Sequence, residues 1–235
     1  MSRAQLQPGD SILREALTPS THAHESNFNL VARPYRRLEY LTLGRSLEDC
    51  RTYFLPQLGD CRRALVLGDG DGRFLAQLLA HNPHLEADAV DTSVTMLELL
   101  RHRCKAAILD ADIRLRTYHS NALNFPLAGR YDLVVTHFFL DCFTQADLDT
   151  LVMRVASTLA PGALWLVSDF RIPAGVMRFP AQMFIRSLYL AFRVLTGLRT
   201  THLPDHVTAL TRSGLVRLAH RQSLAGLLTS ELWKV

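Results

Sequence analysis

The sequence predicts an α/β fold, a Rossmann-like doubly wound sheet of seven strands with helices on both faces. The sheet is expected to be mostly parallel, with an antiparallel hairpin at the C-terminus. Short apolar segments alternate with segments of helical periodicity, which is the pattern of βαβ crossovers and hence of a parallel sheet. A glycine-rich turn follows the first apolar segment directly. Two strand-like segments close the chain with Gly226 between them, which favours a hairpin.

The individual elements follow from hydrophobic periodicity and from the residues that interrupt it. Asn82-Pro83 is expected to end the first helix after the glycine turn, and Pro161-Gly162 the helix before the fifth strand. Strands are expected near 63–67, 86–90, 113–118, 131–136, 163–168, 215–220 and 227–235. Helices are expected near 72–81, 93–105, 145–159, 176–196 and 205–213.

Composition restricts the class of protein. The length of 235 residues fits one globular domain with an added segment. Because 48% of the residues are hydrophobic and only 20% are charged, the composition excludes wholesale disorder. Its four cysteines show no paired spacing, so no metal site or disulfide framework is expected, and reduced thiols fit a cytoplasmic protein. The polar N-terminus is unlike a signal peptide, and no apolar window is long enough to span a membrane.

The turn after the first strand, Gly68-Asp69-Gly70-Asp71-Gly72, indicates a ligand-binding loop. Glycine permits positive φ and lets a ligand lie against the backbone, and the free N–H groups at the helix start favour polar or anionic groups. The dinucleotide fingerprint G-x-G-x-x-G would need glycine at position 73 or 75, which hold Arg73 and Leu75. A nicotinamide oxidoreductase is therefore disfavoured.

Polar residues also follow the other parallel strands, where ligands of open α/β sheets bind. Asp91 ends the second strand, nineteen residues after Gly72, a distance at which an acid can hold ribose hydroxyls. Asn121 follows the third strand and could read an adenine edge, and Thr136-His137 ends the fourth. Each of these alone fits an ordinary turn or cap, but together they indicate a nucleotide-like cofactor.

Because these motifs occur in this order, the chain resembles the class I S-adenosylmethionine-dependent methyltransferases over roughly residues 28–235. The resemblance implies S-adenosylmethionine as the cofactor, with the glycine loop around its methionine part. It also implies that Asp91 holds the ribose and that the residues after it pack on adenine. The cofactor-binding residues expected on this basis are Gly68, Asp69, Gly70, Asp71, Gly72, Asp91, Thr92, Met96, Asn121, Ala122 and Thr136.

One position departs from that family. The acid that usually precedes the first glycine by two residues is replaced by Val66. We hypothesise that Asp69 or Asp71 supplies the missing carboxylate to the methionyl ammonium; the alternative is that both loop acids face solvent. A methyltransferase-fold protein that binds the cofactor or a related ligand without transferring methyl, as a binding module or a cyclase-like catalyst, is the alternative function.

A narrower resemblance links residues 28–44 and the C-terminal strand to the quinone-biosynthesis methyltransferases. It implies a small, hydrophobic or aromatic acceptor, with Tyr35 on the substrate side. The expected organisation is a flexible lead-in over 1–27 and one domain over 28–235. Within that domain, 28–60 forms a helical cover and 176–205 a helical insertion over the acceptor site.

Methyl transfer from a sulfonium is an in-line displacement that needs alignment more than a covalent nucleophile. His137 is the candidate general base and substrate contact, with Asp141 to orient it; a packed core histidine is the alternative. The apolar, arginine-containing helix 176–196 is expected to be a lid or a core helix, with contact to an anionic membrane or a dimer partner left open. Monomer and homodimer both fit, and nucleic acid is not expected as a partner.

Overall fold

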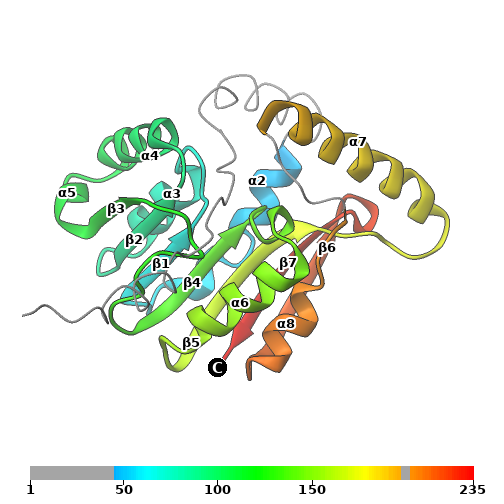
Figure 1. The fold of residues 1–235 in the computed structure, drawn as a ribbon. Coiled ribbons are helices and arrows are strands. Elements are labelled where there is room, and N and C mark those ends of the chain that lie inside the picture. Colours follow the sequence, from blue (N-terminus) through cyan, green and yellow to red (C-terminus); the bar gives the residue numbers. More distant parts are fainter. Residues whose placement is uncertain (1–44, 197–201) are drawn as a thin grey trace, which may run out of the picture.

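A seven-stranded mixed sheet lies at the centre of the protein (Figure 1). The computed structural model describes residues 45–196 and 202–235, except for the side chains of 191–196. The strand order is β3-β2-β1-β4-β5-β7-β6, with β1 to β5 parallel and β7 antiparallel to both of its neighbours. The predicted fold class is thus confirmed. The strands are β1 Arg63–Leu67, β2 Glu86–Asp91, β3 Leu115–His119, β4 Tyr131–His137, β5 Leu159–Phe170, β6 Val216–Ser223 and β7 Leu228–Lys234.

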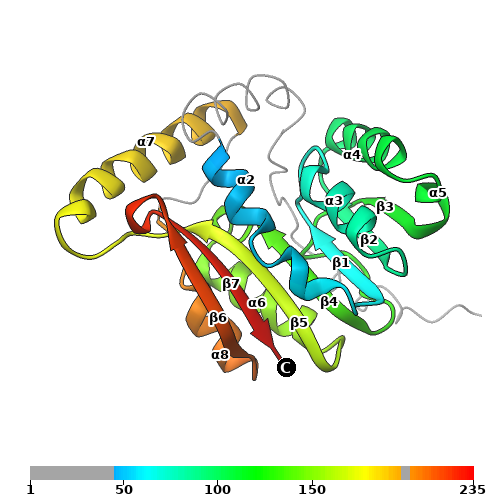
Figure 2. The same ribbon diagram turned by 180° about the vertical axis from the view of Figure 1, so that it is seen from behind.

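Helices cover both faces of the sheet (Figures 1 and 2). The apolar sides of α3 and α4 pack on one face around Phe74 and Leu100, whereas α6 and α8 pack on the other around Trp165 and Leu210. Near the carboxyl end of β5 and the amino end of the antiparallel β7, α2 and α7 share a third apolar cluster. The helices are α2 Arg45–Thr52, α3 Arg73–His81, α4 Val94–Ala107, α5 Ala111–Arg114, α6 Gln145–Ala156, α7 Arg178–Thr196 and α8 His206–Arg212. Short 3₁₀ turns are η2 Leu55–Leu58, η3 Leu140–Cys142, η4 Gly175–Met177 and η5 Leu224–Gly226.

The boundary between α6 and β5 differs from the sequence prediction. The helix ends at Ala156, and β5 already begins at Leu159, before the expected Pro161-Gly162 break. Tyr131 pairs with Leu159 and Leu133 with Leu164, so the residues between lie in a bulge of β5. Proline and a glycine with φ of 78° fit such a bulge, because neither has to complete the ladder there.

The third strand also begins later than expected, because the one-turn helix α5 precedes it. The guanidinium of Arg114, at the end of this turn, is buried and donates to the backbone carbonyls of Leu79, Asn82 and Leu85. It thereby satisfies carbonyl groups at the C-terminal end of α3. These contacts join residues far apart in the chain, and hydrophobic periodicity carries no signal for them.

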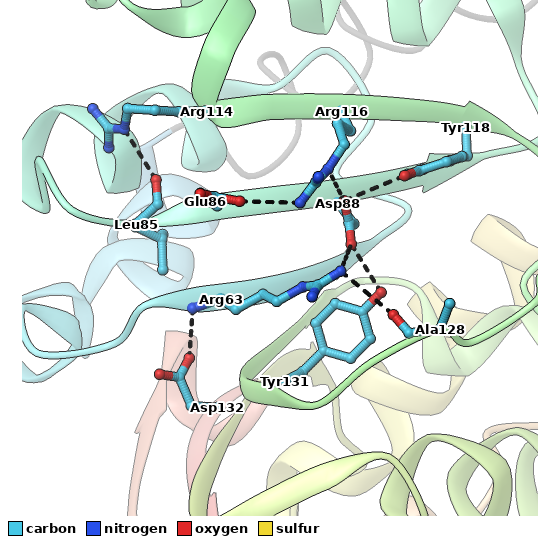
Figure 3. A network of polar contacts seen from close by, with 10 residues as sticks. All are labelled: Arg63, Leu85, Glu86, Asp88, Arg114, Arg116, Tyr118, Ala128, Tyr131 and Asp132. Carbon is cyan, nitrogen blue, oxygen red and sulfur yellow. Dashed lines mark hydrogen bonds and ion pairs between the residues drawn. The ribbon is translucent and has the colours of Figure 1, made fainter.

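A buried carboxylate joins four strands near their amino ends (Figure 3). Asp88 of β2 is 2% exposed, and it accepts hydrogen bonds from Arg116 Nε at 2.9 Å, the Tyr131 hydroxyl at 2.9 Å and Arg63 Nη2 at 3.4 Å. A buried charge is tolerated only when it is paired and hydrogen-bonded in this way. The network fixes β1 to β4 relative to one another, and so positions their opposite, carboxyl ends.

Candidate functional site

The glycine loop connects β1 to α3 at the point where the sheet order changes direction, since β1 lies between β2 and β4. Gly68, Gly70 and Gly72 have φ angles of 67°, 62° and 78°, in the left-handed region. A Cβ at Gly68 would overlap the Phe139 ring and one at Gly72 would lie 2.8 Å from Leu100 Cα, whereas one at Gly70 would meet none of the described residues within 4 Å. The first and third glycines are therefore closely packed, and the described residues leave space beside the middle one.

The two loop aspartates are placed differently. Asp71 forms ion pairs with Arg103 Nη2 at 2.9 Å and Arg73 Nε at 3.3 Å. Asp69 accepts a hydrogen bond from the backbone N–H of Leu75 at 3.0 Å, in the first turn of α3. Burial raises the pKa of the Asp69 carboxyl from 3.8 to about 7, against the smaller lowering effects of the Leu75 N–H and Arg51. Two arginines thus neutralise Asp71, while Asp69 carries a costly charge at the loop.

We expect Asp69→Asn to stabilise the folded protein at pH 8 but not at pH 4. Because its folded pKa is raised, wild-type Asp69 takes up a proton on folding between about pH 4 and 7, so its contribution lowers stability as pH rises through that interval. An amide keeps the hydrogen bond from Leu75 without the charge. Urea denaturation should show a gain of about 1–3 kcal/mol at pH 8, reduced by solvent screening at this partly exposed position. An equal gain at both pH values would contradict this explanation.

Asp91 lies beside the loop, at the carboxyl end of β2. Its Oδ1 accepts from the backbone N–H of Ser93 at 2.8 Å, and burial raises its pKa to about 6, against hydrogen bonds from the Ser93 and Thr92 N–H groups. The Gly68 N–H donates to Val90 O at 3.0 Å, which ties the loop to this strand. Ser93 caps α4 by accepting from the Met96 N–H. The expected Asp91, Thr92 and Met96 therefore share one corner with the glycine loop.

The remaining expected cofactor residues divide into two groups. Ser120 N–H donates to Asp91 O at 3.1 Å, which places the turn containing Asn121 and the buried Ala122 next to the acid. The Asn121 side-chain oxygen accepts from the Leu123 N–H at 2.9 Å and so shapes this turn. Thr136 is fully buried, and its hydroxyl accepts from Trp165 Nε1 on the α6 face. Tyr35, expected on the substrate side, lies outside the described residues.

The structure does not form the expected hydrogen bond between His137 and Asp141. His137 is 3% exposed and packs edge-on against Phe74, and neither ring nitrogen has a hydrogen-bond partner among the described residues. Burial, with a smaller contribution from Arg51, holds its pKa well below the usual value, so the imidazole is neutral. Asp141 lies in η3, where its backbone carbonyl accepts from the Tyr189 hydroxyl at 3.0 Å, and burial raises its pKa to about 6.

An aromatic row, which the sequence analysis did not identify as part of a site, follows β4 and β5. Phe138 has a φ of 51°, a strained conformation for a bulky residue. Its ring centroid lies 5.1 Å from that of Phe170, which lies 6.4 Å from that of Phe184 in α7. The Arg51 guanidinium lies over the Phe138 ring at 5.0 Å. Strain at Phe138 depends on its neighbours in β5, since its N–H donates to Ser168 O, so the sequence alone gives no signal for it.

The described residues form neither a metal-binding cluster nor a membrane-spanning helix. Among these residues, no three His, Cys, Asp or Glu side chains are grouped as a metal site would require. No helix in these ranges is long and apolar enough to cross a lipid bilayer.

Comparisons with known proteins bear on the fold. Residues 65–165 match the family model described as a methyltransferase domain. An O-methyltransferase family protein from Burkholderia thailandensis aligns with a TM-score of 0.66 at 20% identity, over 86% of this chain and 59% of its own. The N-methyltransferase NodS from Bradyrhizobium japonicum, in complex with S-adenosylhomocysteine, aligns with a TM-score of 0.60 at 17% identity, over 82% and 87%.

A third solved structure, an O-methyltransferase family 2 protein from Planctomyces limnophilus in complex with apigenin, has a TM-score of 0.63 at 17% identity and covers 85% of this chain and 61% of its own. At such identities these likenesses show the fold. The chain spans about three fifths of the length of the two O-methyltransferases. A search of the curated proteins found no match. The narrower resemblance to the quinone-biosynthesis group is not supported by these matches.

Proposed function

We propose that this chain is a class I S-adenosylmethionine-dependent methyltransferase and that it transfers a methyl group from that cofactor to a small hydrophobic or aromatic acceptor; its fold and the match to a methyltransferase domain over residues 65–165 support this. One observation carries the proposal. Three left-handed glycines lie at the switch point of the sheet, directly beside a half-buried acid, Asp91, at the end of the adjacent strand. This is the place and the chemistry that a nucleoside with a polar tail requires.

The residues present fit S-adenosylmethionine. The space that the described residues leave beside Gly70 admits a ligand close to the backbone, and the Asp91 carboxylate is an acceptor suited to ribose hydroxyls. Asn121 and Met96 would border the adenine, and Asp69 is the loop acid that we assign to the methionyl ammonium, because two arginines already neutralise Asp71. When bound, the cofactor supplies a methyl group that is activated by its sulfonium.

The aromatic row supports a hydrophobic or aromatic acceptor. Phe138, Phe170 and Phe184 follow one another from the end of β4 to α7, the element that we assign as an insertion over the acceptor site. Aromatic rings favour offset or edge-on contact with another ring and exclude water from it. In our proposal these side chains orient the acceptor for in-line attack, and alignment in a dry site supplies most of the rate acceleration.

His137 would act only when the acceptor must lose a proton. Its neutral imidazole has two ring nitrogens without a partner among the described residues, so it can accept one. Its lowered pKa makes it a weak base, which suits an acceptor that is already acidic, such as a phenol.

The function is tested by incubating the purified protein with methyl-labelled S-adenosylmethionine and a panel of phenols, aromatic amines and hydrophobic carboxylates. We expect labelled product from at least one acceptor and tight binding of S-adenosylhomocysteine by calorimetry. Cofactor binding with no transfer to any acceptor would favour the alternative of a binding module or cyclase-like catalyst. Failure to bind the cofactor would reject both.

A His137→Phe variant separates catalysis from packing in the same assay. Phenylalanine fills the site beside Phe74 and removes two unpartnered buried nitrogens, so we expect unfolding to need about 1–3 kcal/mol more free energy. For an acceptor that loses a proton, we expect kcat to fall about 100-fold with KM little changed. Gained stability with unchanged kcat would show that His137 only packs the core.

A further inference from the structure

The helix α7 is apolar on two opposite sides. Its inner side, with Ala181, Ile185 and Tyr189, packs in the cluster that also contains Phe170 and Leu228. The outer face, which we define by Val176 in the preceding turn and by Phe179, Met183, Arg186 and Leu190, is exposed to solvent. Its apolar members Val176, Phe179, Met183 and Leu190 are 93%, 71%, 50% and 63% exposed.

These exposed residues form a stripe rather than scattered positions. Phe179, Met183, Arg186 and Leu190 recur at spacings of three and four residues, so they share one side of the helix. A helix that covers a protein surface normally carries polar residues on that side, and a contiguous exposed apolar surface marks an interaction site. In Figures 1 and 2, α7 lies at the periphery of the molecule, beyond the carboxyl ends of β4 and β5.

The charges within the segment that contains this face have one sign. Between Asp169 and Asp205 the sequence contains five arginines and no aspartate or glutamate. Arg171, Arg178 and Arg186 are all exposed in the structure. An apolar stripe whose charged neighbours within the segment are all cations is complementary to a surface with an apolar interior and anionic groups at its boundary.

Other binding partners fit the outer face of α7 less well. A second copy that met this face through a two-fold axis would bring the same arginines together. The segment 1–44 holds five arginines and four acidic residues, so it offers little net negative charge. Nucleic acid is bound by stacking aromatics or by basic grooves, whereas Val176, Met183 and Leu190 are aliphatic.

We propose that the outer face of α7 binds the surface of an anionic phospholipid membrane. Phe179, Met183 and Leu190 insert at the level of the upper acyl chains, and Arg178 and Arg186 contact lipid phosphates. The helix then lies parallel to the membrane, as interfacial amphipathic helices do. This binding is independent of the proposed methyl transfer.

Vesicle flotation with the full-length protein tests the proposal. We expect binding to vesicles of phosphatidylcholine mixed with phosphatidylglycerol, little binding to phosphatidylcholine alone, and loss of binding at high salt. Arg186→Glu should lower the partition coefficient at least about fivefold, and Phe179→Glu at least about tenfold.

Two matched variants serve as controls. Arg130→Glu makes the same charge reversal at an exposed position next to the amino end of β4, and Leu109→Glu places the same charge at an exposed leucine after α4. Both should bind vesicles like the wild type. Absent binding by wild type, or equal losses in test and control variants, would overturn the proposal. Binding to duplex DNA that is lost only in the α7 variants would instead identify nucleic acid as the partner of this face. Dissociation of a dimer by Phe179→Glu, with vesicle binding unchanged, would instead identify a second copy of the chain.

Discussion

Gly72→Ala is expected to lower the free energy of unfolding by about 3–5 kcal/mol and to abolish cofactor binding. Two costs combine at this position. The backbone has a φ of 78°, where a Cβ adds about 1–2 kcal/mol of strain. The new Cβ would also lie 2.8 Å from Leu100 Cα, a backbone atom in the middle of α4 that cannot rotate away. The loop or the helix must therefore shift, and the N-terminus of α3 shifts with it.

Gly70→Ala is the matched control for this experiment. Its φ of 62° imposes similar strain, but no residue of 45–196 or 202–235 lies within 4 Å of the position that a Cβ would occupy there. Urea denaturation should show a loss of only about 1–2 kcal/mol. Calorimetry with S-adenosylhomocysteine should still show weaker binding, since the added methyl group occupies the space that we assign to the ligand. Equal destabilisation by both substitutions would mean that contact with α4 does not limit the loop.

Local patterns predicted the parts of the site that depend on neighbours in the sequence. The glycine loop and Asp91 are examples. The loop can be recognised from its residue types, and the acid from its position at the end of a predicted strand. The α/β order was predictable for the same reason, since each strand and helix shows its own period. The predicted positions of β1, α3 and β4 agree with the structure to within about one residue.

Contacts between distant segments account for what the sequence did not reveal. Whether Asp71 or Asp69 is free to bind a ligand depends on Arg103, which is 32 positions from Asp71. The start of β3 depends on where the Arg114 guanidinium binds. The composition of α7 indicates an apolar helix, but only the packing shows which side is buried and which is exposed.

Asp91→Asn is expected to weaken binding of S-adenosylhomocysteine about 100-fold, or about 2.7 kcal/mol. Asparagine retains an oxygen that can accept from the Ser93 N–H, so the turn into α4 should persist. What it loses is the charge, which makes hydrogen bonds from ribose hydroxyls roughly twice as strong as neutral ones. Calorimetry gives the dissociation constant, and thermal unfolding without ligand should show that the variant is folded.

The pH dependence of binding distinguishes this charge from a purely structural role. Burial raises the pKa of Asp91 to about 6, and a ligand that needs the carboxylate binds less tightly once that group is protonated. The ratio of the dissociation constants of the Asn variant and the wild type should therefore fall about tenfold for each pH unit below 6, because only the wild type loses this charge, whereas Asp69 titrates in both proteins. Asp112→Asn, at an exposed position in α5, should leave the wild-type affinity and profile intact. A wild-type affinity that stays constant from pH 7 to about pH 5 would contradict the assignment of Asp91 as the ribose acceptor.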